Sequence, residues 1–532
     1  MSVRLLGGEM PHWSEPVDTG ARGAVLAALA AAAHGRTLVV GPHGAEVVDP
    51  LTAGELTLLV RGTPDAEALA RRYATRPGVR VWCGSLDKLA AEPEFDTVLA
   101  LDGLDRTGST ESPELPWSQA LARLLAVLRP GGRLLLGLPN PAGLHRLVAL
   151  PAEPGVTEWP APAEDDPTRP VSLSELHAAV RSAGLEVLRG YAAFPSPDAP
   201  SALLGAELLA DPRMRGLLQS TLRRALVPAA PLLADPRPIA MRLLHAGLAG
   251  PTAPGWVVVA TRPGGPARPD LPGALIGTGP AGVDRVEHDP ARGWLRVGAG
   301  AARVVPAGRC LHDVLLAAAR GHDHPAFRGL LTAWQAGALA GVDADEIVVD
   351  PDGLLHGLGR PLDAPAPLAA GPAAPEPTSA EVATAEDTAA GPAGSRRDGE
   401  ALRRFARAMF DEGLSHLWPT PADESEVTAL LAEMAGRVAP DRAADAHDGP
   451  PTLRETVAQR DRLRRELAEA RAQADWYERR AARRDAELIR ANRIISALKA
   501  TAPGRAATVV AGGLRTGKRV ARAALRRLRP DG

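Results

Sequence analysis

The sequence predicts an α/β fold built on a doubly wound, mostly parallel sheet of seven strands. Two observations lead to this prediction. Over about the first 262 residues, short apolar runs alternate with helical patterns. Strict alternation of strand and helix favours a parallel sheet that is covered by helices on both faces. The candidate strands are residues 37–40, 56–60, 79–83, 96–101, 133–138, 185–188 and 256–260.

Helical patterns lie between the candidate strands, for example at residues 64–74, 117–128 and 172–184. The last of these opens with Ser172, and Glu175 follows three residues later. This spacing is typical of a capping box, in which the serine side chain accepts a hydrogen bond from the first turn of the helix.

Length and composition limit the class of protein. A chain of 532 residues is too long for one core, and 45% hydrophobic residues can fill several. Cys83 and Cys310 have no CxxC partner, so the sequence supports neither a disulfide framework nor a metal site. No apolar run reaches the ~20 residues that span a bilayer, and the N-terminus lacks a signal-peptide pattern. We therefore expect a cytoplasmic protein.

The region after residue 262 is expected to form a small α+β domain over 263–361, with a hairpin closed at Asp352 and Gly353. Residues 362–399 are rich in Pro, Ala, Gly and Ser, a composition that predicts a disordered linker. A helical segment at 400–440 should pack back on the α+β region.

Residues 453–500 carry a heptad pattern that predicts a coiled-coil helix of roughly 70 Å. Most of the core positions are apolar or aromatic, which favours self-association into a homo-oligomer through 453–498 over the alternative of an isolated solvated helix. The number of strands stays open. The core positions are Leu453, Thr456, Arg460, Leu463, Leu467, Ala470, Ala474, Tyr477, Ala481, Arg484, Leu488, Ala491, Ile495 and Leu498.

The C-terminal end is basic. From Leu453 onward the chain has 21 Lys and Arg against nine Asp and Glu, a net charge of +12, while the rest carries −14. Residues 501–532 form a basic amphipathic tail, and the cations of 505–529 could bind an anionic membrane at the inner face. A solvated tail is the alternative. Nucleic acid is disfavoured because no aromatic residue in the tail could stack on a base.

Two segments resemble class I S-adenosylmethionine-dependent methyltransferases. "FDTVLALDGLDR" is similar to the fourth-strand segment of that family, and "ALARLLAVLRPGGRLLLGLPNPAG" to its helix, PGG turn and fifth strand. The resemblance covers about residues 20–262, and the chain as a whole looks like actinobacterial proteins with this domain. It implies a Rossmann-like fold with S-adenosylmethionine as cofactor.

The resemblance places the cofactor turn at Gly41, Pro42, His43 and Gly44. The family has an acidic residue followed by G-x-G-x-G here, whereas this chain has Val39 at the acidic position and His43 at the middle glycine. His43 could be a general base, because an imidazole titrates near neutral pH. A hydrogen-bonded structural histidine is the preferred interpretation.

The other expected site residues also depart from the family pattern. Arg61 stands where the family has its ribose-binding carboxylate, and a guanidinium cannot accept hydroxyl protons. Ser85 and Leu86 stand near the expected adenine, where the family often has an acid. Asp102 and Asp105, after the fourth strand, lie at the expected substrate-facing edge, but solvated loop carboxylates are the preferred interpretation. No acid–base pair is specific enough to be named as catalytic.

Two hypotheses follow. The first is a divergent methyltransferase that acts on a small-molecule or glycan acceptor and is oligomerised by the coiled coil. The second is a non-catalytic scaffold that keeps the methyltransferase fold, while its coiled coil and basic tail mediate assembly at an anionic membrane surface.

Overall fold

The computed structural model describes most of the chain up to residue 500, and its compact units are residues 1–455 and 456–532. The described residues are 2–15, 20–52, 54–110, 112, 115–150, 166–227, 232–265, 269–279, 282–298, 301–359, 392–412, 414, 417, 424–437 and 453–500. The expected linker falls outside them up to residue 391, and the basic tail lies entirely outside them.

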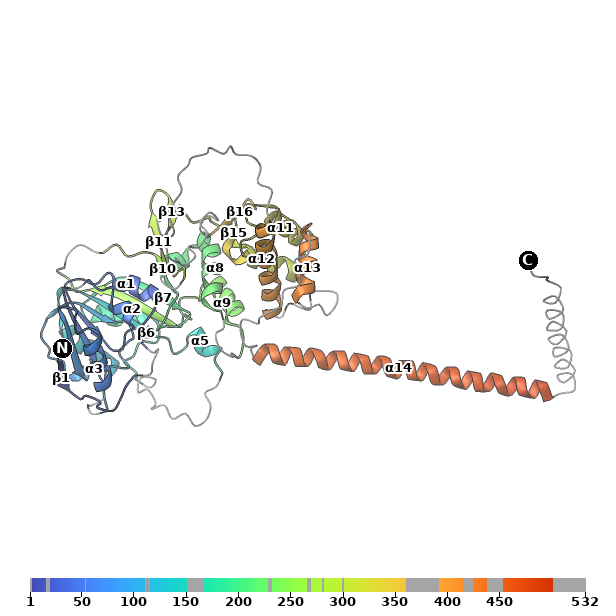
Figure 1. The fold of residues 1–532 in the computed structure, drawn as a ribbon, viewed down its shortest axis with the longest axis horizontal. Helices are drawn as coiled ribbons and strands as arrows, with labels where there is room; N and C mark the ends of the chain where they lie inside the picture. The colour runs from blue at the N-terminus through green and yellow to red at the C-terminus, as the bar shows by residue number, and fades with distance from the viewer. Residues whose placement is uncertain are drawn as a thin grey trace, which may run out of the picture. The chain divides into compact units, whose positions relative to one another are not determined.

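One sheet of 13 strands forms the first part of the chain (Figure 1). All seven expected strands are present, but the predicted count is too low, because β1 adds to one edge and β8 and β10 to β13 extend the other. The bounds are β1 Val3–Gly7, β2 Arg36–Val40, β3 Glu55–Val60, β4 Val79–Gly84, β5 Phe95–Ala100, β6 Leu128–Pro139, β7 Glu186–Phe194, β8 Ala202–Gly205, β9 Gly255–Thr261, β10 Ala274–Gly277, β11 Val283–Asp289, β12 Gly293–Gly298 and β13 Ala301–Val304.

The strand order is β1-β4-β3-β2-β5-β6-β9-β7-β8-β10-β11-β12-β13. The strands from β1 to β6 in this order pair in parallel, and from β9 onward the pairing is antiparallel. The chain order reverses between β2 and β5. In doubly wound folds the ligand binds outside the carboxyl ends of the strands at such a switch point.

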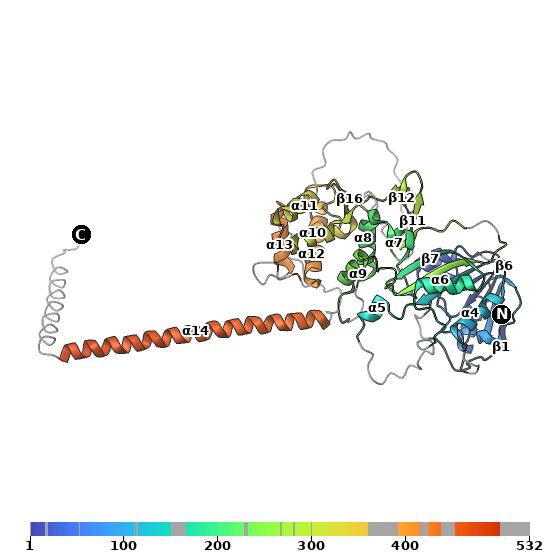
Figure 2. The same cartoon turned by 180° about the vertical axis from the view of Figure 1, so that it is seen from behind.

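Helices cover both faces of the sheet. The first face packs on α1 (Ala24–Ala30), α2 (Ala45–Val48) and α3 (Thr63–Arg72), and the opposite face on α4 (Trp117–Ala126) and α6 (Leu173–Ser182) (Figures 1 and 2). Alternate strand residues face each side, as Val39 and Val40 of β2 do. The other helices before residue 250 are α5 Leu144–Leu147, α7 Ala206–Ala210, α8 Arg215–Ala225 and α9 Pro236–His245.

The predicted helix start at Ser172 is confirmed. The Ser172 hydroxyl accepts a hydrogen bond from the Glu175 N–H at 3.2 Å. The Glu175 carboxylate reaches back to the N–H of Val171 at 2.9 Å, one residue before the position that a capping box uses.

A second core lies beyond the sheet. It combines α10 (Leu311–Arg320), α11 (His324–Ala336), α12 (Pro392–Asp411), α13 (Glu424–Met434) and β15 (Ile347–Val349). The predicted hairpin is confirmed, since β15 pairs antiparallel with β16 (Leu355–Gly357) and Gly353 takes a positive φ of 83° in the turn. Strand β14 (Arg309–Cys310) completes this small sheet.

Two expected boundaries differ from the structure. The sheet runs across residue 262, because β10 pairs with both β8 and β11, so strands β10 to β13 belong to the first sheet. Helix α12 begins at Pro392, inside the segment that composition assigned to a disordered linker. Residues 392–399, PAGSRRDG, have no apolar periodicity of their own, so the sequence did not indicate that the helix begins here.

Helix α14 spans Leu453–Ala500 without interruption. This matches the predicted length of helix, but a single chain does not test whether it forms a coiled coil. Among the described residues, no helix is both long enough and apolar enough to cross a membrane.

A buried ion cluster joins the sheet region to the second core. The Arg223 guanidinium of α8 contacts the carboxylates of Asp313 at 2.5 Å and Glu412 at 2.7 Å, and its side chain is only 5% exposed. Burial raises the pKa of Glu412, but contacts with His312 and Arg223 outweigh it and hold this pKa at about 2. The cluster therefore depends on all of its charges being present.

We expect Arg223→Ala to lower the free energy of unfolding by about 3 kcal/mol or more, because it leaves the buried carboxylate of Asp313 unpaired and removes one of the cations that contact Glu412. The matched control is the neighbouring Arg224→Ala, whose side chain is 49% exposed and pairs with Glu346 at the surface; it should cost less than about 1 kcal/mol. Urea denaturation of both variants measures the difference, and equal losses would contradict a structural role for the cluster.

Candidate functional site

The turn after β2 lies at the switch point of the sheet. Gly41 has a φ of +85°, and the nearest atom to a side chain built there would be the Asp102 Oδ2 at 3.9 Å. Its N–H donates to the Leu59 carbonyl at 2.9 Å, which fixes the turn against β3. The backbone at Gly41 is thus open to a ligand in a conformation that favours glycine.

His43 is held by both ring nitrogens. Nδ1 lies 3.1 Å from the Gly41 carbonyl and must donate to it, so Nε2 accepts from the Leu101 N–H at 3.3 Å. Burial lowers the pKa of His43 to about 4, and repulsion from Arg106 adds to the effect. A neutral imidazole with no free nitrogen cannot take a proton from a substrate, which agrees with the preferred structural interpretation.

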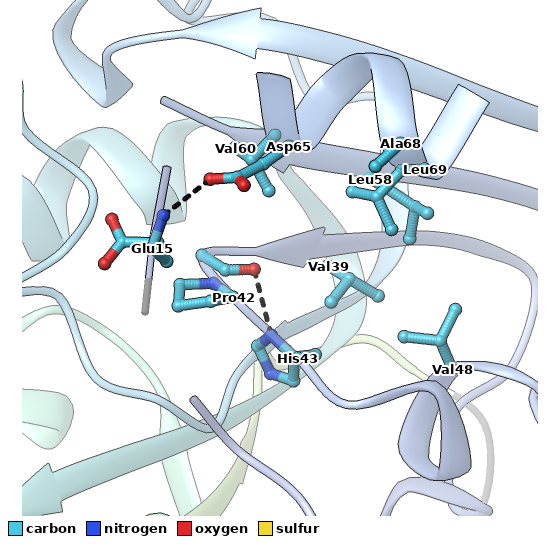
Figure 3. Close-up of a pocket in the computed structure, with 11 residues that line it drawn as sticks. Glu15, Val39, Pro42, His43, Val48, Leu58, Val60, Asp65, Ala68 and Leu69 are labelled. Atoms are coloured by element: carbon cyan, nitrogen blue, oxygen red, sulfur yellow. Dashed lines mark hydrogen bonds between the residues drawn. The ribbon is translucent and has the colours of Figure 1, made fainter. Parts of the chain in front are cut away.

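A hollow of about 210 Å³ opens beside this turn (Figure 3). Its walls are mainly apolar and come from β2, β3, α2 and α3. Two carboxylates, those of Glu15 and Asp65, stand at its rim and are the charged groups among its lining residues. The lining consists of Glu15, Val39, Gly41, Pro42, His43, Val48, Leu58, Val60, Asp65, Ala68 and Leu69.

Residues 8–15, which we call the N-terminal strap, cross the carboxyl ends of β3 and β4. The Met10 N–H donates to the Arg61 carbonyl at 2.9 Å, and the Thr63 N–H donates to the Met10 carbonyl at 3.2 Å. At the other strand, a side chain built at Gly8 would come within 3.0 Å of the Ser85 Cβ. The strap is therefore fixed over the edge where the resemblance places a cofactor.

Arg61 contacts the strap instead of an open site. Its Nε donates to the Glu15 carboxylate at 2.7 Å, its guanidinium lies 5.6 Å from the ring centroid of Trp13, and a third contact reaches the Gly108 carbonyl. Glu15 also lies 3.7 Å from Arg106. Arg61 thus serves to anchor the strap.

Asp65 supplies a carboxylate that the family pattern did not identify. It lies in the first turn of α3, and its Oδ2 would be 2.8 Å from a side chain built at Gly62, directly after β3. The carboxylate therefore folds back over the strand end where ribose hydroxyls are bound in doubly wound folds. An acidic residue three positions after Gly62 was the available signal, but acids in a first helical turn are common because they complement the helix dipole.

Two donors of the strap occupy this carboxylate. The Ser14 hydroxyl donates to Asp65 Oδ1, and the Glu15 N–H donates to Oδ2 at 3.0 Å. Figure 3 shows the second of these bonds at the rim of the hollow. Both oxygens of Asp65 are thus in use by the chain itself.

The expected adenine end is also closed. The Ser85 N–H donates to the Gly7 carbonyl at 3.0 Å and the Leu86 N–H to the Thr107 carbonyl at 2.9 Å. Both residues are about 1% exposed. Their backbone donors, the groups that could bind a base here, are therefore satisfied internally.

Asp102 is buried, in contrast to the expectation of an exposed loop carboxylate. Its side chain is 3% exposed, and both oxygens accept hydrogen bonds from Arg106, one at 2.8 Å from Nε. Burial raises the pKa of Asp102 to about 6, although Arg106 opposes the shift. Asp105 pairs with Arg169 at 3.1 Å, so neither carboxylate stands free toward an acceptor.

The structure thus gathers most of the expected site at one edge. Gly41, Pro42 and His43 line the hollow, whereas Gly44, the next residue, does not. Arg61 and Asp102 lie close to it through Glu15 and Arg106. Ser85 and Leu86 lie under the strap. Among the described residues, no group of three or more His, Cys, Asp and Glu could hold a metal ion.

Comparison with known proteins gives limited information. No protein-family model matches the sequence, and no curated protein is similar to it. Solved structures with a similar fold include the [4+2]-cyclase SpnF, with 15% identity over 48% of this chain and 88% of that one, at a TM-score of 0.25. Such scores carry no argument about the site or the reaction.

Two methyltransferases are among the other similar structures. The 1,6-didemethyltoxoflavin-N1-methyltransferase of Burkholderia thailandensis, solved with bound S-adenosylhomocysteine, is 17% identical over 45% of this chain and 76% of its own, at a TM-score of 0.24. The CcbJ methyltransferase of Streptomyces caelestis is 17% identical over 47% of this chain and 99% of its own, at a TM-score of 0.26.

We expect the His43 ring to remain a neutral Nδ1–H tautomer from pH 8 down to about pH 5. The reason is that its folded pKa of about 4 lies below the usual value of 6.5. The contribution of the neutral His43 ring to the free energy of unfolding is thus complete above pH 6.5, and it is lost as the pH falls from 6.5 through 4. Nitrogen-15 NMR of the ring measures the tautomer and midpoint; a midpoint near 6.5 would contradict the burial.

Proposed function

We propose that this chain is a divergent class I methyltransferase that binds S-adenosylmethionine at the carboxyl edge of β2 and β3. The observation that supports it best is the carboxylate of Asp65 over the end of β3, beside the open glycine turn at Gly41. These are the two features that dinucleotide and nucleoside sites of this fold require: close backbone approach and an acceptor for ribose hydroxyls.

The strap bonds to Asp65 as a ribose would. A ribose presents two neighbouring hydroxyl donors, and Asp65 now accepts one hydroxyl, from Ser14, and one N–H, from Glu15. A carboxylate that accepts two hydrogen bonds from its own chain can exchange both donors for two hydroxyl donors of a ligand, and it is then not left unpaired. The strap and the nucleoside therefore compete for the same two oxygens.

The groups present fit one half of the cofactor better than the other. Gly41, the backbone of Pro42 and the Asp65 carboxylate would hold the ribose side, and the apolar walls of the hollow would exclude water. The base side requires residues 7 and 107 to release the N–H groups of Ser85 and Leu86. When bound, S-adenosylmethionine supplies a methyl group on a positively charged sulfur, and many methyl transfers need mainly orientation from the protein.

A small-molecule or glycan acceptor remains part of this proposal. We also retain the homo-oligomer through 453–498 and the anionic membrane surface for 505–529 as predictions, the latter on residues outside the described part of the chain.

The second candidate is a non-catalytic scaffold. It is favoured by the closed adenine end and by the pairing of Asp102 with Arg106, which leaves no free carboxylate at the acceptor side. The two candidates differ in whether the full chain binds the cofactor once the strap is loosened.

Loosening the strap should increase cofactor affinity. We expect Ser14→Ala to bind S-adenosylhomocysteine roughly tenfold more tightly than the native chain, because the ligand no longer displaces the hydroxyl from Asp65. Calorimetric titration of the full chain measures the two dissociation constants. If neither protein binds, the scaffold hypothesis is correct and the methyltransferase proposal fails.

The role of Asp65 has its own test in the same background. We expect Ser14→Ala/Asp65→Asn to lose that gain and bind at least tenfold more weakly than Ser14→Ala, because an amide has only one acceptor oxygen. Glu67→Gln, on the same helix with a 59% exposed side chain, is the matched control and should leave affinity unchanged. Equal affinity with and without Asp65 would remove it from the site.

A further inference from the structure

Helix α14 exposes a row of large apolar side chains along its heptad core positions. The side chains of Leu467, Tyr477, Leu488 and Ile495 are between 47% and 64% exposed. Positions a and d of a heptad repeat fall on one side of a helix, so these residues share one stripe. A helix of 48 residues that leaves such a stripe in water gains most of its stability from a partner.

We propose that α14 pairs with α14 of a second copy as a two-stranded, antiparallel coiled coil. In the proposed alignment Arg460 of one copy faces Ala491 of the other, and Leu467 faces Arg484. This alignment pairs the two helices over their full length, since the outermost core positions, 453 and 498, face each other.

The polar core positions favour the antiparallel arrangement. Arg460 and Arg484 occupy an a and a d position, and both are exposed in the single chain. In a parallel, in-register pair each of them would face its own copy, which places two like charges together in two layers of the core. The antiparallel alignment sets each arginine opposite an alanine or a leucine, over which its apolar stem can pack.

The flanking charges agree with this alignment. Positions e of the two helices then face each other, which brings Arg464 opposite Asp485 and Arg471 opposite Glu478, each pair occurring twice by symmetry. All four side chains are exposed in the single chain. Glu466 and Glu487 also come opposite each other, but next to Arg484, which can neutralise them.

Engineered cysteines test the partner and its direction in the full chain. Arg460→Cys and Ala491→Cys are made separately and co-expressed, with oxidised glutathione to form disulfides. The native Cys83 and Cys310 are buried and do not interfere. In an antiparallel pair residue 460 lies ~46 Å from residue 460 of the other copy, so each variant alone should give no disulfide and the co-expressed pair should give one.

The outcomes separate cleanly. A disulfide in the mixture only, with a light-scattering mass of two chains, supports the proposal. Disulfides within Arg460→Cys or Ala491→Cys alone would show a parallel pair, and a mass of one, three or more chains would exclude a two-stranded coil; either result overturns the proposal. Ala486→Cys, on the outer face at position f, is the matched control and should not cross-link in any arrangement.

A charge exchange provides an independent test. Arg471→Glu should weaken the dimer roughly tenfold, because it turns two attractive pairs with Glu478 into repulsive ones. The double variant Arg471→Glu/Glu478→Arg restores opposite charges in the antiparallel alignment and should recover native affinity in sedimentation experiments. In a parallel pair position 471 would instead face Glu466, and Glu478→Arg would rescue nothing.

Discussion

The carboxyl edge of a parallel sheet carries backbone and side-chain polar groups that need partners, and in this protein the chain supplies those partners itself. Buried N–H groups and carboxylates without partners cost several times the net value of a hydrogen bond. Here the strap satisfies Asp65 and Arg61, residues 7 and 107 satisfy Ser85 and Leu86, and the ring of His43 closes the turn. The polar groups at this edge, where doubly wound folds bind a ligand, thus have partners even when no ligand is bound.

This constraint connects Arg61 with the strap. An arginine at position 61 would be a poor substitute for a ribose-binding acid, but it is a suitable anchor for the Glu15 carboxylate of the strap. With the strap anchored, Ser14 and Glu15 reach Asp65. Arg61, at the end of β3, and the strap that it anchors are thus parts of the same arrangement.

The sequence predicted the central sheet well because its strands are continuous apolar runs, as Leu134, Leu135 and Leu136 of β6 illustrate; all three are fully buried. Strands β1 and β11 were missed because they are edge or surface strands: Leu5 is 63% exposed, and β11 mixes charged with apolar residues. The extension of the sheet past residue 262 depends on pairing between β8 and β10, which no local pattern records.

The sequence predicts where in the fold the candidate site lies, but not which residues form it. The glycine turn follows from its position after β2, whereas Asp65 joins the site only because its side chain folds back over Gly62. The covering strap could not be predicted, since residues 8–15 contact residues that lie 46 or more positions away. Asp102 was expected at the surface because local sequence does not reveal that Arg106, four residues later, encloses it.

Hydrogen–deuterium exchange of the full chain, with and without S-adenosylhomocysteine, tests most directly whether the strap and the ligand compete. The account predicts that ligand speeds exchange of peptides from the strap, residues 8–15, while exchange at the Gly41 turn slows. Protection of both regions together would contradict it, because the strap would then close over the ligand instead of making way for it.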